Sequence, residues 1–183
     1  FINSDLSKKK TFEQIKKKYS KKNLTILVGG PPCQGFSIYG KRRFINSKSY
    51  NPHSDKRNKL VFTFLNYAKL LKPEWIMMEN VPGIVNLDDG YFINILLKNI
   101  NKLGYKNCEY KIINTADYGV PQKRKRFILL ANRLGLTIPW PKPKYFENPK
   151  DWQLPYRSIK EVISDLDKIK SYDDFHNHIP MKH

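Results

Sequence analysis

Apolar and polar positions alternate along the chain in two ways, as short continuous apolar runs and as longer stretches with helical spacing. The β-branched run Leu24–Val28 stops at two glycines and two prolines, which predicts a buried parallel strand that ends in a loop. Over 58–71 apolar residues recur every three or four positions, as in a mostly buried helix. A second apolar run at 75–78 and a second periodic stretch at 92–103, ended by Gly104, repeat this pair. The strand–helix–strand–helix order predicts an α/β fold.

Further elements are expected at both ends of the chain. Residues 11–14, Thr-Phe-Glu-Gln, have the form of a capping box, so a short basic helix is expected to begin there. The stretches 109–114 and 127–131 predict two short strands, which should pair antiparallel because the segment between them is too short for a crossover helix. After a loop rich in proline and aromatic residues, Ser-x-x-Glu predicts a last helix over 158–169.

The composition narrows the class of protein. A chain of 183 residues supports one domain with a sizeable core. The net charge of +18 favours an anionic partner such as nucleic acid, although a solvated lysine-rich surface explains much of the excess equally well. The hydrophobic fraction of 40% excludes a disordered basic tail, and no apolar run approaches the ~20 residues that span a bilayer. Two cysteines exclude a disulfide scaffold and a four-cysteine zinc site.

Two loops carry the candidate chemistry. Ligands of open α/β sheets bind beyond the carboxyl ends of the strands, so the stretches 29–37 and 79–83 should border one crevice. Cys33 follows two prolines near basic residues, which favours a reactive thiolate, while a small buried filler explains the same context equally well. Glu79 is either a site carboxylate or a solvated one. Cys108 has no basic or histidine neighbour and is interpreted as structural.

Three motifs, in this order, resemble the signature of the cytosine-5 methyltransferase family. They are Pro31-Pro32-Cys33-Gln34-Gly35-Phe36-Ser37, Glu79-Asn80-Val81 and Gln122-x-Arg124-x-Arg126. Arg57-Asn58-Lys59-Leu60 and the stretch 116–121 also resemble the family, so the resemblance extends over about residues 5–133. It implies an incomplete Rossmann-like fold of S-adenosylmethionine-dependent methyltransferases, with parallel strands followed by an antiparallel edge hairpin.

The resemblance also implies a covalent mechanism. Cys33 would add to C6 of cytosine, after which C5 takes the methyl group from S-adenosylmethionine. Glu79, protonated or sharing a proton, would contact N3 and the exocyclic amine. Arg126 would reach the cytosine O2, and Arg124 would order the catalytic loop or the glutamate. The assignment of the two arginines stays open, as does a purely structural basic strand edge. The further residues expected to bind substrate are Pro32, Gln34, Ser37, Asn80, Gln122 and Arg57.

Two neighbouring features bear on how DNA would be held. Positions 122, 124 and 126 alternate, so their side chains are expected to share one face of a strand. The loop 39–58 carries six basic residues and a single acid, Asp55. It could close over DNA from which the target base has been rotated out, or it could be a plain solvated loop.

The resemblance assigns the cofactor to three residues. Asp5 would contact the adenine of S-adenosylmethionine with Leu6 beside it, and Leu60 would line the same site, unless Leu60 serves only the helix core. No glycine-rich loop of the family's form precedes Gly29, so the first cofactor-binding strand is expected to be absent. Residues 1–140 are therefore expected to be part of a catalytic domain. Residues 141–183 would lead toward a target-recognition region that is absent, and this chain alone is expected to bind the cofactor weakly and to be inactive.

The sequence thus predicts a bacterial DNA (cytosine-5) methyltransferase of a restriction-modification system. It is expected to be a cytoplasmic monomer that acts on double-stranded DNA without metal or membrane, with a cognate restriction endonuclease as a further partner. Two alternatives remain. A tRNA cytosine-5 methyltransferase uses the same apparatus but usually has proline and threonine in place of Gly35 and Ser37. A non-catalytic DNA-binding relative would have kept the fold alone.

Overall fold

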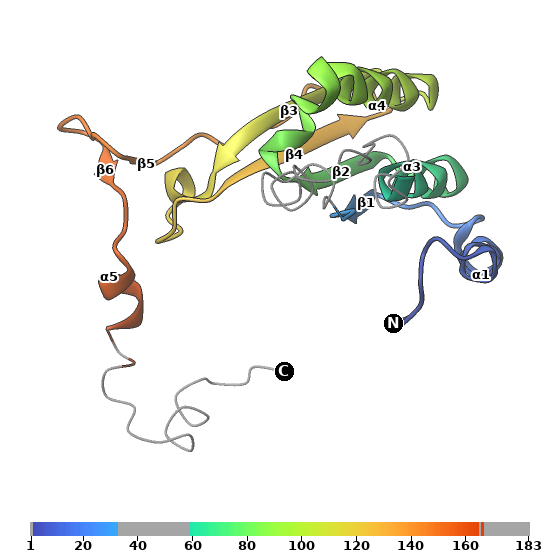
Figure 1. Ribbon diagram of the computed structural model, residues 1–183, viewed down its shortest axis with the longest axis horizontal. Helices are drawn as coiled ribbons and strands as arrows, with labels where there is room; N and C mark the ends of the chain where they lie inside the picture. The colour runs from blue at the N-terminus through green and yellow to red at the C-terminus, as the bar shows by residue number, and fades with distance from the viewer. Residues whose placement is uncertain (1, 33–58, 165, 167–183) are drawn as a thin grey trace, which may run out of the picture. The chain divides into compact units, whose positions relative to one another are not determined.

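The structure of the chain is a computed structural model, which describes residues 2–32, 59–164 and 166 (Figure 1). Its helices and strands follow one another in a mixed α/β order. They are α1 (Lys9–Tyr19), β1 (Ile26–Gly29), α3 (Lys59–Leu71), β2 (Trp75–Asn80), α4 (Tyr91–Lys102), β3 (Asn107–Asn114), β4 (Lys125–Asn132), β5 (Tyr145–Phe146), β6 (Leu154–Pro155) and α5 (Ile159–Ile163), with 3₁₀ turns η1 (Pro82–Ile84), η2 (Leu87–Gly90) and η3 (Thr115–Tyr118). Among the described helices, none is both long and apolar enough to cross a membrane.

The chain divides into two compact units. The first consists of Phe1–Ile113 and Lys125–Trp140, and the second of Asn114–Arg124 and Pro141–His183. The second unit therefore includes the segment between β3 and β4 as well as the carboxyl-terminal part. Whether residue 140 ends a catalytic domain stays a prediction.

The first unit is built on a four-stranded sheet with the order β1-β2-β4-β3. β1 pairs with β2 in parallel, and β2 pairs with β4 in antiparallel orientation. The arrows of β3 and β4 run in opposite directions (Figure 1), as the short connection between them predicts. The expected fold class, a Rossmann-like sheet of parallel strands followed by an antiparallel pair at the edge, is confirmed.

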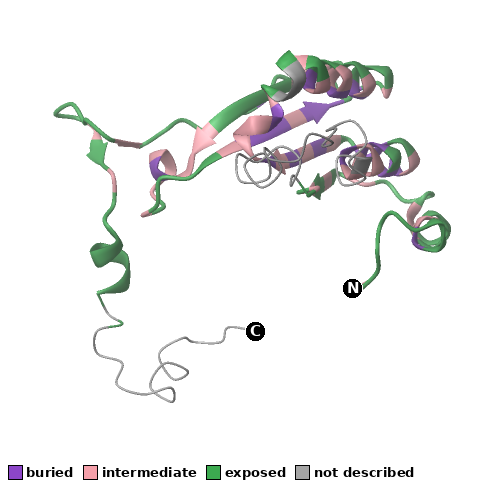
Figure 2. Ribbon diagram, viewed as in Figure 1, coloured by how far each residue is buried: buried purple, intermediate pink, exposed green. Residues whose placement is uncertain are grey.

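The hydrophobic core lies between one face of this sheet and two helices. Alternate residues of β2 and β4 point to that face, so Ile76 and Met78 lie opposite Ala131 and Leu129 and are fully buried (Figure 2). Helices α3 and α4 cover them with the residues whose spacing predicted both helices; these are Val61, Leu65, Ala68, Ile93, Leu96 and Ile100. α4 is followed by Gly104 at φ +92°, the left-handed conformation expected of a residue after a helix.

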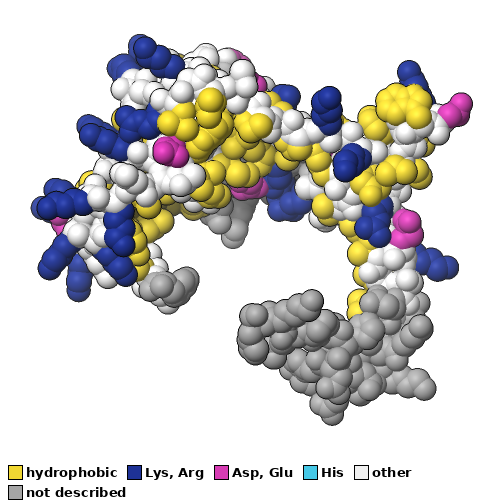
Figure 3. All heavy atoms as spheres, turned by 180° about the vertical axis from the view of Figure 1, so that it is seen from behind, with side chains coloured by type: hydrophobic (Ala, Val, Ile, Leu, Met, Phe, Trp, Pro, Cys, Tyr) yellow, Lys and Arg dark blue, Asp and Glu magenta, His cyan; other side chains and the backbone are white. Residues whose placement is uncertain are grey.

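The opposite face of the sheet is only partly covered at β1. Ile26 and Val28 point to this face and are 49% and 60% exposed. Seen from behind, hydrophobic side chains gather at the surface of the molecule in the region of the sheet (Figure 3). The expectation of a buried strand was therefore wrong for β1, because β1 lies at the edge of the sheet. An apolar β-branched run indicates that a strand is suited to burial, but it does not show which part of a protein packs against the strand.

The two capping patterns had opposite outcomes. α1 begins at Lys9, two residues before Thr11, so the expected capping box is wrong. Thr11 is instead 2% exposed, and its hydroxyl forms a hydrogen bond with the hydroxyl of Ser4 (2.7 Å). The capping box of α5 is confirmed: the backbone N–H of Glu161 donates to Ser158 Oγ (3.2 Å), and that of Ser158 donates to Glu161 Oε2 (2.6 Å). The latter bond lowers the pKa of Glu161 below its usual value.

The second unit is held together by a polar cluster at η3. The hydroxyl of Tyr156 donates to Asp117 Oδ1 (2.5 Å), which raises the pKa of Tyr156. Asn114 Nδ2 donates to Asp117 Oδ1 (3.2 Å) and to the hydroxyl oxygen of Tyr156 (3.1 Å). Nearby, Gly119 has φ +88°, and a Cβ added there would lie 2.8 Å from the ring of Tyr145. The loop rich in proline and aromatic residues is thus ordered around this cluster, with β5 and β6 paired in parallel.

Candidate functional site

Glu79 and Arg126 come together across the central strands of the sheet. Glu79 lies within β2, which runs two residues further than the apolar run predicted, and it is paired with Ile128 of β4. Arg126 precedes Ile128 by two positions, so its side chain shares a face with Glu79. Arg126 Nε lies 2.7 Å from Glu79 Oε1, with the arginine side chain 19% and the glutamate side chain 45% exposed. The pair is a charge-assisted contact at the open end of β2.

Asn80 points to the other face and holds the segment ahead of Cys33. Its side chain is 1% exposed, and Nδ2 donates to the carbonyl oxygen of Pro31 (3.1 Å). Its Oδ1 accepts from the backbone N–H of Val81 (2.9 Å). Both polar ends of this buried amide are thereby satisfied by backbone groups. The end of β2 and the Pro-Pro segment are thus tied to one another.

Two glycines allow β1 to end close to this site. A Cβ added at Gly30 would lie 3.2 Å from Glu79 Oε2. A Cβ added at Gly29 would lie 2.8 Å and 2.9 Å from ring carbons of Phe64, on α3. The glycine pair is therefore required by close approach, whereas the sequence pattern indicated only the end of a strand.

A cleft of about 380 Å³ opens beside the end of β1 and collects all three residues expected to bind the cofactor, Asp5, Leu6 and Leu60. Further parts of its wall come from Gly30, Pro31, Pro32, Phe64 and Tyr67. The Tyr67 hydroxyl donates to the carbonyl oxygen of Leu6 (2.9 Å) and so fixes the entering chain. An apolar wall with one carboxylate fits an adenosyl group, whose ring can pack on the aliphatic side chains while its amine donates to the acid.

The carboxylate of Asp5 is held in place by its own turn. Its Oδ1 accepts from the backbone N–H of Ser7 (2.9 Å) and from the Ser7 hydroxyl (2.7 Å). These hydrogen bonds, assisted by the charge of Lys8, keep the pKa of Asp5 below its usual value. The group is therefore an ionised hydrogen-bond acceptor near neutral pH.

The structure adds one contact to the arginine assignment: Arg126 holds Glu79. The role expected of Arg124 stays a prediction. The expectation that positions 122, 124 and 126 share one strand face is wrong, because β4 begins at Lys125 and residues 122 and 124 precede it. In the second unit, the backbone N–H of Arg124 donates to Asn114 Oδ1 (3.0 Å), and the carbonyl oxygen of Gln122 accepts from the Thr115 hydroxyl (2.7 Å).

Other expected site residues lie outside the described part of the chain. Those outside are Cys33, Gln34, Ser37 and Arg57, together with the whole of the basic loop 39–58. Burial and the neighbouring Glu109 raise the pKa of the Cys108 thiol to about 11, which accords with its interpretation as structural. Among the described residues, no group of three or more His, Cys, Asp or Glu could hold a metal ion.

Comparison with known proteins identifies the family. The model of C-5 cytosine-specific DNA methylases matches residues 2–182. Type II methyltransferase M.AquIA of Picosynechococcus is 32% identical over 78% of this chain and 60% of its own length, and M.XorII of Xanthomonas oryzae is 38% identical over 67% and 27%. A methyltransferase encoded within an E. coli prophage shares the fold, with a TM-score of 0.55 at 24% identity over 88% of this chain and 40% of its own. The chain thus spans 60% or less of the length of these relatives, and it belongs to the C-5 cytosine-specific DNA methylase family.

Proposed function

We propose that the protein transfers a methyl group from S-adenosylmethionine to C5 of cytosine in double-stranded DNA. The observation that carries the proposal is the Glu79–Arg126 pair, which lies against Gly30 just ahead of the Pro-Pro-Cys segment. The adjacent cleft, lined by Asp5 and Leu6, supports a bound adenosyl group. Membership of the family supports cytosine in DNA as the target.

Cys33 supplies the nucleophile in this proposal. Its thiolate adds to C6 of cytosine, and the electron pair of the C5–C6 double bond moves into the ring toward N3. When bound, S-adenosylmethionine would supply an electrophilic methyl group; as C5 takes it up, the bond from the methyl group to the sulfonium sulfur would break and S-adenosylhomocysteine would leave. A base then removes the C5 proton, the C5–H electron pair re-forms the C5–C6 double bond, and the Cys33 sulfur leaves C6 as a thiolate. The target base has to leave the stack for this attack, a step assigned to the basic loop 39–58.

Glu79 and Arg126 stabilise the ring during the addition. A proton shared between Glu79 and N3 neutralises the charge that develops there, and the other carboxylate oxygen accepts from the exocyclic amine of cytosine. Arg126 holds Oε1 of Glu79 and thereby orients Oε2. In the DNA complex Arg126 also reaches the cytosine O2, and Arg124 is proposed to order the catalytic loop or the glutamate, with a phosphate contact as the alternative. Cytosine offers an acceptor at N3 and a donor amine beside it, whereas thymine has an N–H at N3 and a carbonyl oxygen. The Glu79–Arg126 pair is therefore proposed to select cytosine as well.

The setting of the reaction is part of the proposal as well. The two relatives described above are named type II methyltransferases, which supports a restriction-modification role with a cognate endonuclease. We assign the protein to the cytoplasm as a monomer on DNA. Pro32, Gln34, Ser37, Asn80, Gln122 and Arg57 are proposed to bind or position the substrate, and Leu60 joins Asp5 and Leu6 at the cofactor.

The test is covalent capture with DNA that contains 5-fluorocytosine, because fluorine at C5 cannot leave as a proton. The full reading frame is incubated with S-adenosylmethionine and mixed-sequence duplex, and intact mass is measured for the wild type, Cys33→Ser and the matched control Cys108→Ser. The proposal expects a protein–DNA adduct that carries one methyl group in the wild type and the control but not in Cys33→Ser. No adduct despite demonstrated cofactor binding, or an adduct formed only with tRNA, would contradict the proposal.

A further inference from the structure

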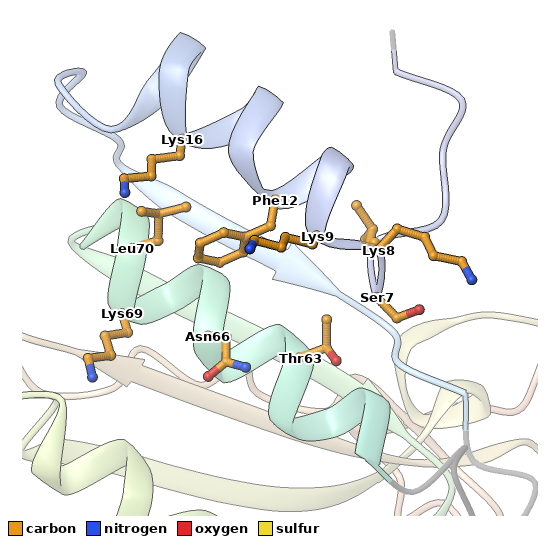
Figure 4. A pocket seen from close by; sticks show the side chains of 10 residues that line it. Ser7, Lys8, Lys9, Phe12, Lys16, Thr63, Asn66, Lys69 and Leu70 are labelled. Carbon is orange, nitrogen blue, oxygen red and sulfur yellow. The ribbon is translucent and has the colours of Figure 1, made fainter.

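A second hollow, separate from the Glu79–Arg126 pair, lies between α1 and α3 (Figure 4). Its volume is about 690 Å³, and it adjoins the cofactor cleft through the shared lining residues Leu6 and Thr63. We call it the lysine groove after the four lysines in its lining, Lys8, Lys9, Lys16 and Lys69. No residue of the lysine groove has a role in the chemistry proposed above except Leu6.

The charge of the lysine groove is not neutralised by its surroundings. Its four lysine side chains are exposed, and within the described residues none of them forms an ion pair. The nearest acid of the preceding turn, Asp5, is engaged by Ser7 and influenced by Lys8. Glu13 is the only acidic residue of α1. The net potential of the groove is therefore strongly positive.

The lysines are held on elements that pack against each other. Phe12 of α1 points toward α3 in Figure 4, and its ring lies 5.3 Å from the ring of Tyr67 (centroid to centroid, tilted by 47°). Tyr67 is itself buried in α3. Because this contact joins the two helices, Lys9 and Lys16 on one side and Lys69 on the other frame a defined hollow and are not merely scattered on the surface.

We propose that the lysine groove binds the phosphodiester backbone of duplex DNA, at a place distinct from the flipped base. Lysine contacts phosphates as a point charge, and the described segments 2–32 and 59–71 contain no arginine. The positive surface continues past the groove along α1 and its end, through Lys10, Lys17, Lys18, Lys21 and Lys22. Such a stripe fits an extended polyanion better than a small anion, and DNA is the polyanion with which the DNA methylase family is associated.

The binding contributed by the groove is independent of sequence and dependent on salt. Removing one lysine–phosphate interaction should reduce the slope of log affinity against log salt by about 0.9, so removing all four should reduce it by up to about 3.6. The inference needs neither Cys33 nor the methyl donor. Its failure and a failure of the proposed chemistry are therefore distinguishable.

The experiment compares two charge-matched variants of the chain without methyl donor. The groove variant carries Lys8→Gln, Lys9→Gln, Lys16→Gln and Lys69→Gln, and the control variant carries Lys98→Gln, Lys102→Gln, Lys106→Gln and Lys111→Gln, four exposed lysines outside the groove and outside the stripe along α1. Affinity for a random-sequence duplex is measured by fluorescence anisotropy across a salt series. The expected result is an affinity loss of at least about tenfold and a shallower salt slope in the groove variant alone.

A second measurement locates the contact directly. Lysine acetylation, followed by peptide mass spectrometry with and without duplex, should show protection of Lys9, Lys16 and Lys69 but not of Lys98. Equal losses of affinity in both variants, or uniform protection, would refute the groove as a site. Groove-dependent binding that is tighter for an RNA duplex or for polyglutamate than for DNA would refute DNA as its occupant. Circular dichroism melting of both variants verifies that they are folded.

Discussion

Substituting alanine at either of the two glycines at the end of β1 should have different effects: Gly29→Ala should lower stability, and Gly30→Ala should slow the proposed reaction. In Gly29→Ala the new Cβ would lie 2.8 Å and 2.9 Å from two ring carbons of Phe64, well inside van der Waals contact. Phe64 packs against the core, so its ring has to shift together with α3. Overpacking of this kind costs about 1–3 kcal/mol of unfolding free energy, or roughly 2–12 °C in melting temperature for a chain of this size.

Gly30→Ala should behave in the opposite way. Its new Cβ would lie 3.2 Å from Glu79 Oε2, which is the end of a flexible and half-exposed side chain. The carboxylate can retreat by a few tenths of an ångström, so the unfolding free energy should change by less than about 0.5 kcal/mol. The carboxylate would then no longer stand where Arg126 holds it. Because small misplacements of a catalytic group are costly, covalent capture should slow by about tenfold or more.

The assay is urea unfolding of both variants, together with the rate of adduct formation on 5-fluorocytosine DNA by the full reading frame. Folded Gly30→Ala with an unchanged rate would refute the placement of Glu79 beside Gly30 in the reacting complex. Gly29→Ala as stable as the wild type would refute the packing of Phe64 on β1.

Three further predictions concern single side chains. Asn80→Ala leaves the carbonyl oxygen of Pro31 and the backbone N–H of Val81 without their partner. The free energy of unfolding in urea should therefore fall by about 1–3 kcal/mol. A fall below about 0.5 kcal/mol would contradict the buried hydrogen bonds. Cys108, with a pKa of about 11, should resist maleimide at pH 8 until the chain unfolds. Because its pKa in the folded chain exceeds the usual 9.0, the free energy of unfolding should fall as the pH rises from 9 to 11. A fall no larger than that of Cys108→Ser would contradict the raised pKa. Burial raises the pKa of Tyr105 to about 12, and its hydroxyl donates to the carbonyl oxygen of Pro73 (2.7 Å). Tyr105→Phe should therefore lower the free energy of unfolding in urea by about 1–2 kcal/mol, and an ultraviolet pH titration should lose one late-ionising tyrosine. An unchanged titration would show that the hydroxyl is solvated.

The open edge at β1 also gives a physical reason for the expected weak binding of S-adenosylmethionine by this chain. Val28, which lines the cleft that contains Asp5 and Leu6, is 60% exposed. A cleft whose wall is half solvated buries less of a ligand than a closed one. A calorimetric titration that showed tight binding to the chain would contradict this expectation.

Local patterns determined most of the elements. The spacing of apolar residues was sufficient for α3 and α4 because each helix buries a single face, and a face recurs every three or four residues whatever it packs against. The capping patterns were less reliable. Ser158 caps α5, whereas Thr11 is buried against Ser4 inside a helix that begins earlier. A capping sequence is compatible with a helix start, but the tertiary contacts of the hydroxyl decide whether it is used.

The site divides in the same way. The sequence by itself singled out Glu79 and Arg126, because both belong to motifs that resemble those of the cytosine-5 methyltransferase family. Only the tertiary structure decided that these two side chains meet. The register that pairs Glu79 with Ile128 puts Arg126, two positions earlier in β4, on the same face as Glu79. Strand register depends on hydrogen bonds between residues about 50 positions apart, which no local pattern along the chain encodes.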